Sequence, residues 1–356
     1  MLRWRNLLIL PVLAPVLAAV ALSAGSGTAL AQPTTSTPAF NSLTTADNPD
    51  WMAQVPDSTS LAALSVPGTH DTLGIEGGLL PSAYETQQNE GISAATLTAQ
   101  LNAGIRAIDI RVAIVNNGTA FAIHHTDVYE DANFDDVLTK AQAFLAANPG
   151  ETILMDLHGE CDGDTTEGGI GFSTPGHCAD DPSNATEAMR EAIFQSYVAR
   201  YPGLFYAPSV TGTSTAAMPT LGQVRGHIVL TTFTGPLGGV YAGYGLTQLT
   251  TGNWGQYVEN DWTQCDLASK WSLAQANINL ASADPSDMYT TYLSANCAPF
   301  GADPADMAGG YGGGTGENQQ LLSYLDAGSV NRSGVVMTDF PGYSLIDAII
   351  SHNPGV

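Results

Sequence analysis

The stretch "FDDVLTKAQAFLAANPGETILMDLHG", residues 134–159, holds the pattern on which the fold prediction rests. Its first part has apolar residues at helical spacing, starts with two acidic residues and ends at Pro149-Gly150, so we expect a helix there. The part that follows directly, 151–159, has the short apolar run of a buried strand. A helix that leads straight into a strand is the repeating unit of a parallel α/β sheet.

The same alternation extends over most of the chain. We expect strands within 61–68, 105–115, 119–125, 151–159, 226–233 and 333–340, and helices within 97–104, 134–150, 184–205 and 343–352. Strands separated by helices in a chain of 356 residues predict an α/β fold, a single distorted (β/α)8 barrel of the TIM type. A doubly wound open sheet is the alternative, but no Gly-x-Gly-x-x-Gly follows the first strand.

The N-terminal residues have the features of a secretory signal. Arg3 and Arg5 precede an uncharged apolar run, and the small residues at 29–31 fit a cleavage site. We therefore expect a signal peptide over 1–31 and a secreted protein. An uncleaved membrane anchor is the alternative, although the run is short for a spanning helix and contains two prolines.

The rest of the chain is expected to form one domain preceded by a short segment. Residues 32–50 are rich in Thr, Ser and Pro and predict a flexible lead-in, and 51–356 predict the barrel. Three further stretches, 159–183, 234–270 and the Gly-rich 309–320, are expected to be loops.

The charge of the chain excludes one class of function. It has 34 acidic residues against ten Lys and Arg, a net charge of −24. Nucleic-acid binding needs a basic surface to neutralise phosphates, so no nucleic acid is expected as a partner. Adhesion to anionic membranes by bulk electrostatics is disfavoured for the same reason.

Four cysteines remain after the predicted signal: Cys161, Cys178, Cys265 and Cys297. An even number in an exported chain indicates two disulfides, and proximity in sequence favours Cys161–Cys178 and Cys265–Cys297. The other two connectivities stay open. A zinc site is disfavoured because no Cys-x-x-Cys spacing occurs.

Ionisable side chains gather at the ends of the predicted strands. In a parallel barrel the carboxyl ends of the strands form the face where the reactive groups of enzymes collect. A single histidine, aspartate or arginine at such a place is more often structural than catalytic, so the set as a whole carries the argument. The set is His70, Asp71, Asp109, Arg111, His124, His125, His158, Glu160 and Asp339.

These residues lie in blocks that resemble a known family. The blocks are "LSVPGTHDT" at 64–72, "TAQLNAGIRAIDIRV" at 98–112, "AIHH" at 122–125, "TLGQVRGHIVLTTF" at 220–233 and "GVVMTDF" at 334–340. Their order and spacing are similar to those of the bacterial phosphatidylinositol-specific phospholipase C family, whose unit is the X domain. The resemblance runs from about Trp51 to His352.

The resemblance implies an intramolecular phosphoryl transfer. In this family the inositol 2-hydroxyl attacks the phosphodiester, which expels diacylglycerol and leaves inositol 1,2-cyclic phosphate. Matching the blocks makes His70 the general base and His125 the general acid, and two imidazoles suit these tasks because their pKa values start near neutrality.

The matching blocks also give the carboxylates roles. Asp339 is expected to hydrogen-bond His70, Asp71 to steady His125 in its charged form, and Asp109 to support the base and the arginine. His70 and Asp71 are expected to serve different pairs, because adjacent side chains on an extended segment point apart.

Arg111 bears on the cofactor prediction. In eukaryotic relatives a calcium ion neutralises the phosphate, and a metal-binding carboxylate stands at the position of Arg111. A guanidinium grips phosphate oxygens through its own donors and repels a cation, so we expect no metal and no other cofactor. The acidic stretch "GECDGDTTEGG" at 159–169 lacks the register of an EF-hand loop.

The headgroup contacts differ from the family pattern. His158 stands where bacterial relatives have a lysine, and Thr231 and Thr232 stand where they have an arginine. Trp262 is the candidate for the aromatic residue that stacks on the inositol ring. The substrate-binding candidates are therefore His158, Thr232 and Trp262.

Two other functions are weighed against this one. A metal-dependent glycerophosphodiesterase-like hydrolase would need a carboxylate site, with Asp109, Asp156 and Glu160 as candidates. A non-catalytic lipid-binding barrel would be expected to have lost one of the histidines or the arginine. For the preferred function the partner is a phospholipid at a membrane surface, with no stable protein partner and a monomeric chain.

Overall fold

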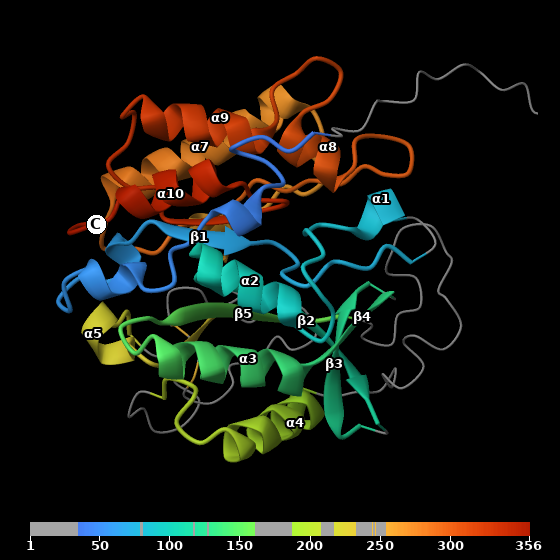
Figure 1. Ribbon diagram of the computed structural model, residues 1–356, viewed down its shortest axis with the longest axis vertical. Coiled ribbons are helices and arrows are strands. Elements are labelled where there is room, and N and C mark those ends of the chain that lie inside the picture. Colours follow the sequence, from blue (N-terminus) through green and yellow to red (C-terminus); the bar gives the residue numbers. More distant parts are fainter. Residues whose placement is uncertain are drawn as a thin grey trace, which may run out of the picture. The chain divides into compact units, whose positions relative to one another are not determined.

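Parallel strands form the curved wall of a barrel (Figure 1). The computed structural model describes residues 35–78, 81–116, 118–126, 128–160, 187–207, 217–232, 244, 246 and 254–356. Along the wall the order is β7, β8, β9, β1, β2, β5 and β6. Their bounds are β1 Val66–Thr69, β2 Ala107–Val115, β5 Ile153–Gly159, β6 Ile228–Thr232, β7 Val258–Glu259, β8 Thr290–Tyr292 and β9 Val335–Thr338. The predicted TIM-type barrel is confirmed; in the described residues it has seven parallel strands, and β6 and β7 do not pair there.

Two further strands form an antiparallel hairpin on β2. β3 (Ala120–His125) pairs with β2, and β4 (Val128–Asn133) pairs with β3. Four residues join β2 to β3, with Asn116 and Gly118 at positive φ. Such a short connection gives an antiparallel pair, because a parallel crossover needs a dozen residues or more. The hairpin carries the His124-His125 pair at the end of β3.

Helices cover the outside of the wall (Figure 1). They are α1 Pro81–Tyr84, α2 Ala95–Ala103, α3 Phe134–Ala147, α4 Glu187–Arg200, α5 Leu221–Val224, α6 Trp254–Tyr257, α7 Leu267–Ala283, α8 Pro304–Gly309, α9 Glu317–Asp326 and α10 Tyr343–Ser351. Three short 3-10 helices span Leu43–Thr45, Trp51–Gln54 and Leu61–Ala63. Gly104 ends α2 at a φ of +119°, a conformation in which glycine avoids the strain of a side chain.

Two of the expected loops contain regular structure. The described part of 234–270 includes α6, β7 and the first turn of α7, and α9 begins at Glu317 inside 309–320. The loop prediction was wrong at these places because neither β7 nor the first turns of the helices have a strong apolar pattern.

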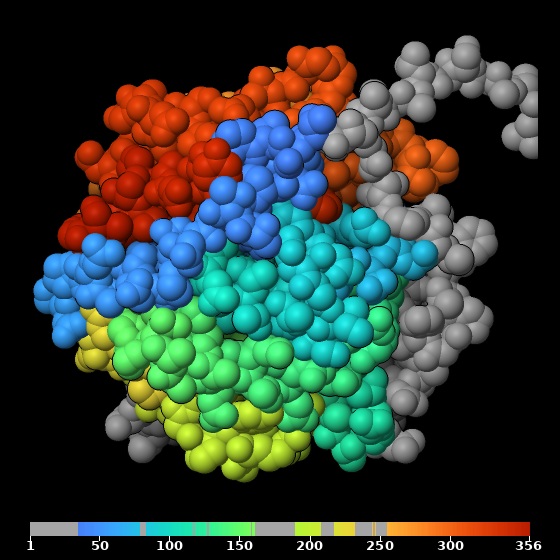
Figure 2. Space-filling model, in the orientation of Figure 1, coloured from blue at the N-terminus to red at the C-terminus, as the bar shows by residue number. Residues whose placement is uncertain are grey.

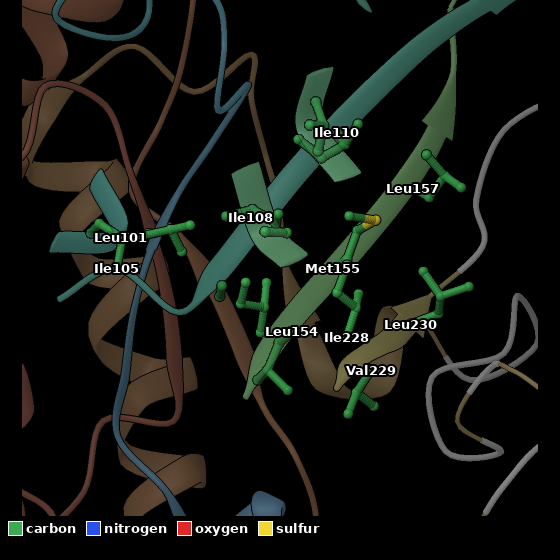
Figure 3. Close-up of a cluster of buried hydrophobic side chains, with 14 of the residues drawn as sticks. Leu101, Ile105, Ile108, Ile110, Leu154, Met155, Leu157, Ile228, Val229 and Leu230 are labelled. Atoms are coloured by element: carbon green, nitrogen blue, oxygen red, sulfur yellow. The ribbon is translucent and has the colours of Figure 1, made fainter. Parts of the chain in front are cut away.

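The core between the wall and the helices is apolar. Figure 3 shows buried side chains of β2, β5 and β6; in this view Ile108 and Met155 lie between Leu101 of α2 and Leu230 of β6. All four are buried. Since side chains alternate along a strand, Asp109 and Arg111 face away from Ile108 and Ile110, toward the interior of the barrel.

The segment before the barrel is packed rather than free. Residues 37–44, here called the N-terminal strap, lie against the loop after β9, and Ala39 and Phe40 are buried. In Figure 2 the blue N-terminal segment lies between the red C-terminal region and the cyan segment. This differs from the flexible lead-in expected over 32–50, because the apolar Phe40 ring packs on Phe340.

Some predictions concern residues outside the described part of the chain, and others can be compared with the structure. The signal peptide over 1–31 and the Cys161–Cys178 disulfide lie outside. The Cys265–Cys297 disulfide is confirmed and joins the start of α7 to the loop after β8. In the described part of the chain no helix has the length and apolar character needed to cross a membrane.

Candidate active site

The ionisable residues of five strands meet at one end of the barrel. His70 follows β1, Arg111 lies in β2, His125 ends β3, Glu160 follows β5 and Asp339 follows β9. His70, Glu160 and Asp339 lie at the carboxyl ends of parallel strands, where the active sites of this class of barrel are found. Arg111 lies in the middle of β2, and His125 reaches the same place from the antiparallel β3. The sequence pattern thus placed these groups together correctly.

His70 is held by a carboxylate on one side of its ring. Its Nδ1 lies 2.9 Å from Oδ1 of Asp339, and its backbone carbonyl accepts a hydrogen bond of 2.7 Å from Nε2 of Gln87. With Nδ1 donating to a carboxylate, Nε2 is left to accept a proton. Burial lowers the pKa of His70, opposed by the charge of Asp71, so the ring is neutral at neutral pH. Burial also raises the pKa of Asp339.

His125 is held through a backbone carbonyl instead. Its Nδ1 donates to the carbonyl oxygen of Tyr84 at 2.8 Å, and the Tyr84 ring meets it edge-on. Its Nε2 lies 3.2 Å from Oδ2 of Asp71. Burial, and then the charge of Arg111, lower the pKa of His125 to about 4. Without substrate this ring is therefore neutral.

Asp71 lies between the two imidazoles. Its Oδ2 is 3.2 Å from Nε2 of His125 and 3.5 Å from Nε2 of His70. The two expected pairs, His70 with Asp339 and His125 with Asp71, are both present, but the expectation that Asp71 points away from His70 is wrong. Asp71 has a φ of +40°, so the backbone is left-handed there rather than extended, and its side chain turns back toward its neighbour.

Arg111 is surrounded by carboxylates. Its guanidinium contacts Asp71, Oδ2 of Asp109 at 3.0 Å and Oε1 of Glu160 at 3.2 Å. Although burial acts in the opposite direction, these three charges raise the pKa of Arg111 well above its ordinary value. Asp109 also accepts the backbone N–H of Asp71 at 3.1 Å, which ties β2 to the turn after β1.

The carboxylates of the metal-dependent alternative are engaged by other groups. Asp109 and Glu160 contact Arg111, and Asp156 accepts a hydrogen bond of 3.0 Å from Tyr292. In the described residues one group has ligand atoms close enough to surround a metal, His70, Asp71 and Asp109, all within 4.8 Å of one another. Arg111 contacts both of its carboxylates, so a cation there would face a fixed positive charge.

The structure describes the backbones of the substrate-binding candidates His158 and Thr232, and both the backbone and the side chain of Trp262. The backbone of His158 pairs with Arg111 across β5 and β2, and that of Thr232 pairs with Asp156 across β6 and β5. The side chains of His158 and Thr232 lie outside the described part. Thr231 donates its hydroxyl to the Met155 carbonyl at 3.3 Å.

Trp262 lies at the rim on the side of His125. Its side chain is 58% exposed, and its carbonyl oxygen accepts the backbone N–H of Asn296 at 2.9 Å. The Asn296 side chain in turn donates to the carbonyl of Ala83 at 2.7 Å, next to Tyr84. This short chain of hydrogen bonds connects Trp262 to the residue that holds His125.

The sequence prediction missed three contacts of the site. Glu160 was expected among the residues at the strand ends and as a metal-ligand candidate, but not as a partner of Arg111. Tyr84 holds His125 through its backbone, which no side-chain motif reveals. Tyr292 meets the His70 ring edge-on, with centroids 5.8 Å apart. The short run "TTYLSA" at 290–295 that contains Tyr292 was the available signal.

Comparison with known proteins gives a consistent result. Residues 81–169 match the family described as "Phosphatidylinositol-specific phospholipase C, X domain". The "1-phosphatidylinositol phosphodiesterase" of Listeria monocytogenes is 28% identical over 316 residues, covering 89% of this chain and 87% of the relative. A protein of the same name from Staphylococcus aureus is 24% identical, covering 83% of this chain and 89% of the relative.

Solved structures show the same fold. The phosphatidylinositol-specific phospholipase C of Listeria monocytogenes superposes with a TM-score of 0.65 at 25% identity, covering 86% of this chain and 99% of that chain. The F249X mutant of the Staphylococcus aureus enzyme gives a TM-score of 0.64 at 21% identity, covering 88% of this chain and 99% of that chain. The second likeness bears on the fold alone.

Proposed function

Because the chain belongs to the bacterial phosphatidylinositol-specific phospholipase C family, we propose that it cleaves phosphatidylinositol, or a glycosyl-phosphatidylinositol, to diacylglycerol and inositol 1,2-cyclic phosphate. One observation carries the proposal: the Nε2 atoms of His70 and His125 flank the same oxygen of Asp71, next to Arg111. A base, an acid and a phosphate-binding cation are the groups that this reaction needs.

His70 acts as the base. Its Nε2 takes the proton from the inositol 2-hydroxyl as that oxygen attacks phosphorus, and the Asp339 carboxylate stabilises the imidazolium that forms. The lowered pKa of His70 keeps the ring neutral, and so able to accept this proton, at neutral pH.

His125 acts as the acid. It gives a proton from Nε2 to the glycerol oxygen as the bond from phosphorus to that oxygen breaks. The anionic diester next to the ring raises the pKa of His125 above its substrate-free value of about 4, so substrate binding favours the protonated form that acts as the acid. The Tyr84 carbonyl keeps Nδ1 as a donor throughout.

Arg111 stabilises the charge on the phosphate. Its donors contact carboxylates in the free protein, so a phosphate oxygen replaces one of these contacts when substrate binds. Asp109 remains its support. The fixed guanidinium supplies the positive charge at this place, and we propose that catalysis needs no metal ion.

We also propose how the headgroup binds and where the protein acts. Trp262 stacks on the inositol ring, and His158 and Thr232 contact its hydroxyls. The chain is secreted after removal of residues 1–31 and acts as a monomer on phospholipid at a membrane surface.

The test compares variants on lipid vesicles. His70→Ala and His125→Ala are each expected to lower diacylglycerol release from phosphatidylinositol vesicles by about a thousandfold or more, since each removes one partner of the proton transfer. Circular dichroism and the melting temperature check that the fold persists. Phosphatidylcholine vesicles serve as the substrate control, and equal turnover of both lipids would overturn the headgroup assignment.

A further inference from the structure

A tyrosine and an aspartate are hydrogen-bonded across the barrel interior beneath the site. The Tyr292 hydroxyl, on β8, donates to Oδ2 of Asp156, on β5, at 3.0 Å. β8 and β5 are not neighbours in the sheet, so this bond crosses the barrel rather than running along its wall. Both side chains are buried, Tyr292 to 99%. None of the steps proposed above uses either of them.

The ring of Tyr292 also contacts the base. It meets the imidazole of His70 edge-on, at a centroid distance of 5.8 Å and an interplanar angle of 84°. The hydrogen bond from Nδ1 of His70 to Asp339 selects the tautomer, but a single bond leaves the ring free to tilt about it. The Tyr292 ring blocks that tilt from one side, and its own hydroxyl is fixed by Asp156.

We propose that Asp156 and Tyr292 form a positioning pair that fixes the ring plane of His70 and keeps the charge of Asp156 directed to the tyrosine hydroxyl instead of to the base. The inference rests on the proposed function, in which His70 is the base. Neither residue touches the reacting atoms; both act through His70.

The charge distribution explains why the hydroxyl is needed. The backbone of Asp156 pairs with that of Asp109, so a second carboxylate stands beside the one that supports Arg111. Burial, and then the charge of Asp156, raise the pKa of Tyr292 well above its ordinary value, so the phenol stays a proton donor. A phenylalanine would keep the ring against His70 but remove the donor from a buried carboxylate.

The test separates the ring from its hydroxyl. In Tyr292→Phe the Asp156 carboxylate loses the tyrosine donor, and its charge favours the imidazolium of His70, so the acidic limb of the kcat/KM profile is expected to move up by about half a pH unit. The kcat is expected to fall about threefold or more with KM unchanged, because the aromatic ring stays against His70 but is no longer fixed through a hydroxyl, and so holds the base less firmly. Adding Asp156→Asn removes the carboxylate charge, so in the double variant the acidic limb of the kcat/KM profile is expected to return to its wild-type position.

A matched control comes from the same part of the chain. Tyr289→Phe removes the hydroxyl of a buried tyrosine, just before β8, whose ring packs on Tyr257 rather than on His70. It is expected to leave the pH profile unchanged. A wild-type profile and kcat in Tyr292→Phe, or a shift that the double variant does not reverse, would overturn the proposal.

A second readout needs no substrate. The His70 ring is titrated by NMR in wild type, Tyr292→Phe and the double variant, with His70→Ala to assign the signal. The pKa of His70 is expected to rise in Tyr292→Phe and to return in the double variant. An unchanged titration contradicts the positioning pair even if the chain turned over no phosphatidylinositol, so failure of the pair and failure of the proposed function are told apart.

Discussion

At the scale of the residue, the site depends on the unusual backbone of Asp71. Its positive φ brings one carboxylate oxygen within 3.5 Å of both imidazoles. A non-glycine residue in the left-handed region carries strain that the surrounding structure must hold, and such residues concentrate at functional sites. The backbone N–H of Asp71 donates to Asp109, which supplies part of that support.

The pH dependence follows from the two histidines. In the proposed mechanism the free protein needs a neutral His70 and a protonated His125, and the pKa of His125 is about 4. We therefore expect kcat/KM to be highest in mildly acidic solution and to fall as the pH rises above that range. The kcat should decline at higher pH than kcat/KM, since bound diester raises the pKa of His125. Steady-state kinetics on a soluble substrate measure both profiles, and an alkaline optimum of kcat/KM would refute the assignment.

The sequence was sufficient to predict that the main residues of the proposed site lie together. His70, His125, Arg111 and Asp339 lie in short blocks that keep their order, so each could be matched to a strand end. The double contact of Asp71 could not be predicted, because it depends on a backbone angle. The partners Glu160 and Tyr292 depend on which strands face each other across the curved sheet.

At the scale of the element, the N-terminal strap supports the loop that carries Asp339. The backbone N–H groups of Asn41, Gly342 and Ser344 each donate across this contact, at 2.8 to 3.0 Å. The rings of Phe40 and Phe340 lie 5.9 Å apart. Phe340, directly after Asp339, has a φ of +44°, so the strap holds a strained turn beside the partner of the base.

Removing that support should weaken catalysis. Phe40→Ala is expected to lower the melting temperature by several degrees and to lower kcat with little change in KM, because a loosened Asp339 orients His70 less well. Leu280→Ala, a truncation at a half-exposed position of α7, is the control. Thermal unfolding and steady-state kinetics check the prediction, and a variant that melts lower but keeps full kcat would show that the strap is only structural.

Elements with a strong apolar pattern were predictable, and others were not. The expected ranges contain β2, β3, β5, β6 and β9 and the helices α3, α4 and α10, and they overlap β1 and α2. The long helix α7 was missed because the buried Lys270 and Asn277 interrupt its apolar face. The strand β8 has three residues, two of them threonine, too few for a period to be recognised.

At the scale of the whole molecule, an acidic protein must meet a lipid surface. The net charge of −24 gives no attraction to anionic lipid, so contact has to come from apolar groups. Phe300 is 96% exposed, and Trp262 lies in a neighbouring loop. The Cys265–Cys297 disulfide joins the two loops, and the Phe300 N–H donates to the Cys297 carbonyl within its own loop.

This arrangement predicts a separation of binding from chemistry. Phe300→Ala removes an apolar side chain worth about 2 kcal/mol on transfer out of water, so affinity for phosphatidylinositol vesicles should fall at least tenfold. Turnover of a soluble, monomeric substrate should be unchanged, because Phe300 contacts none of the catalytic groups. Vesicle sedimentation and parallel assays measure the two effects. Equal losses on both substrates would place the defect in the site instead of at the membrane.

In the proposed mechanism two histidines and an arginine transfer the phosphoryl group without a metal ion. This is tested by phosphorus NMR of phosphatidylinositol vesicles incubated with the protein in excess chelator. We expect a growing signal of the five-membered cyclic phosphate, which His125→Ala abolishes. A signal of inositol monophosphate alone from the first time point, or no turnover until calcium is added, would contradict it.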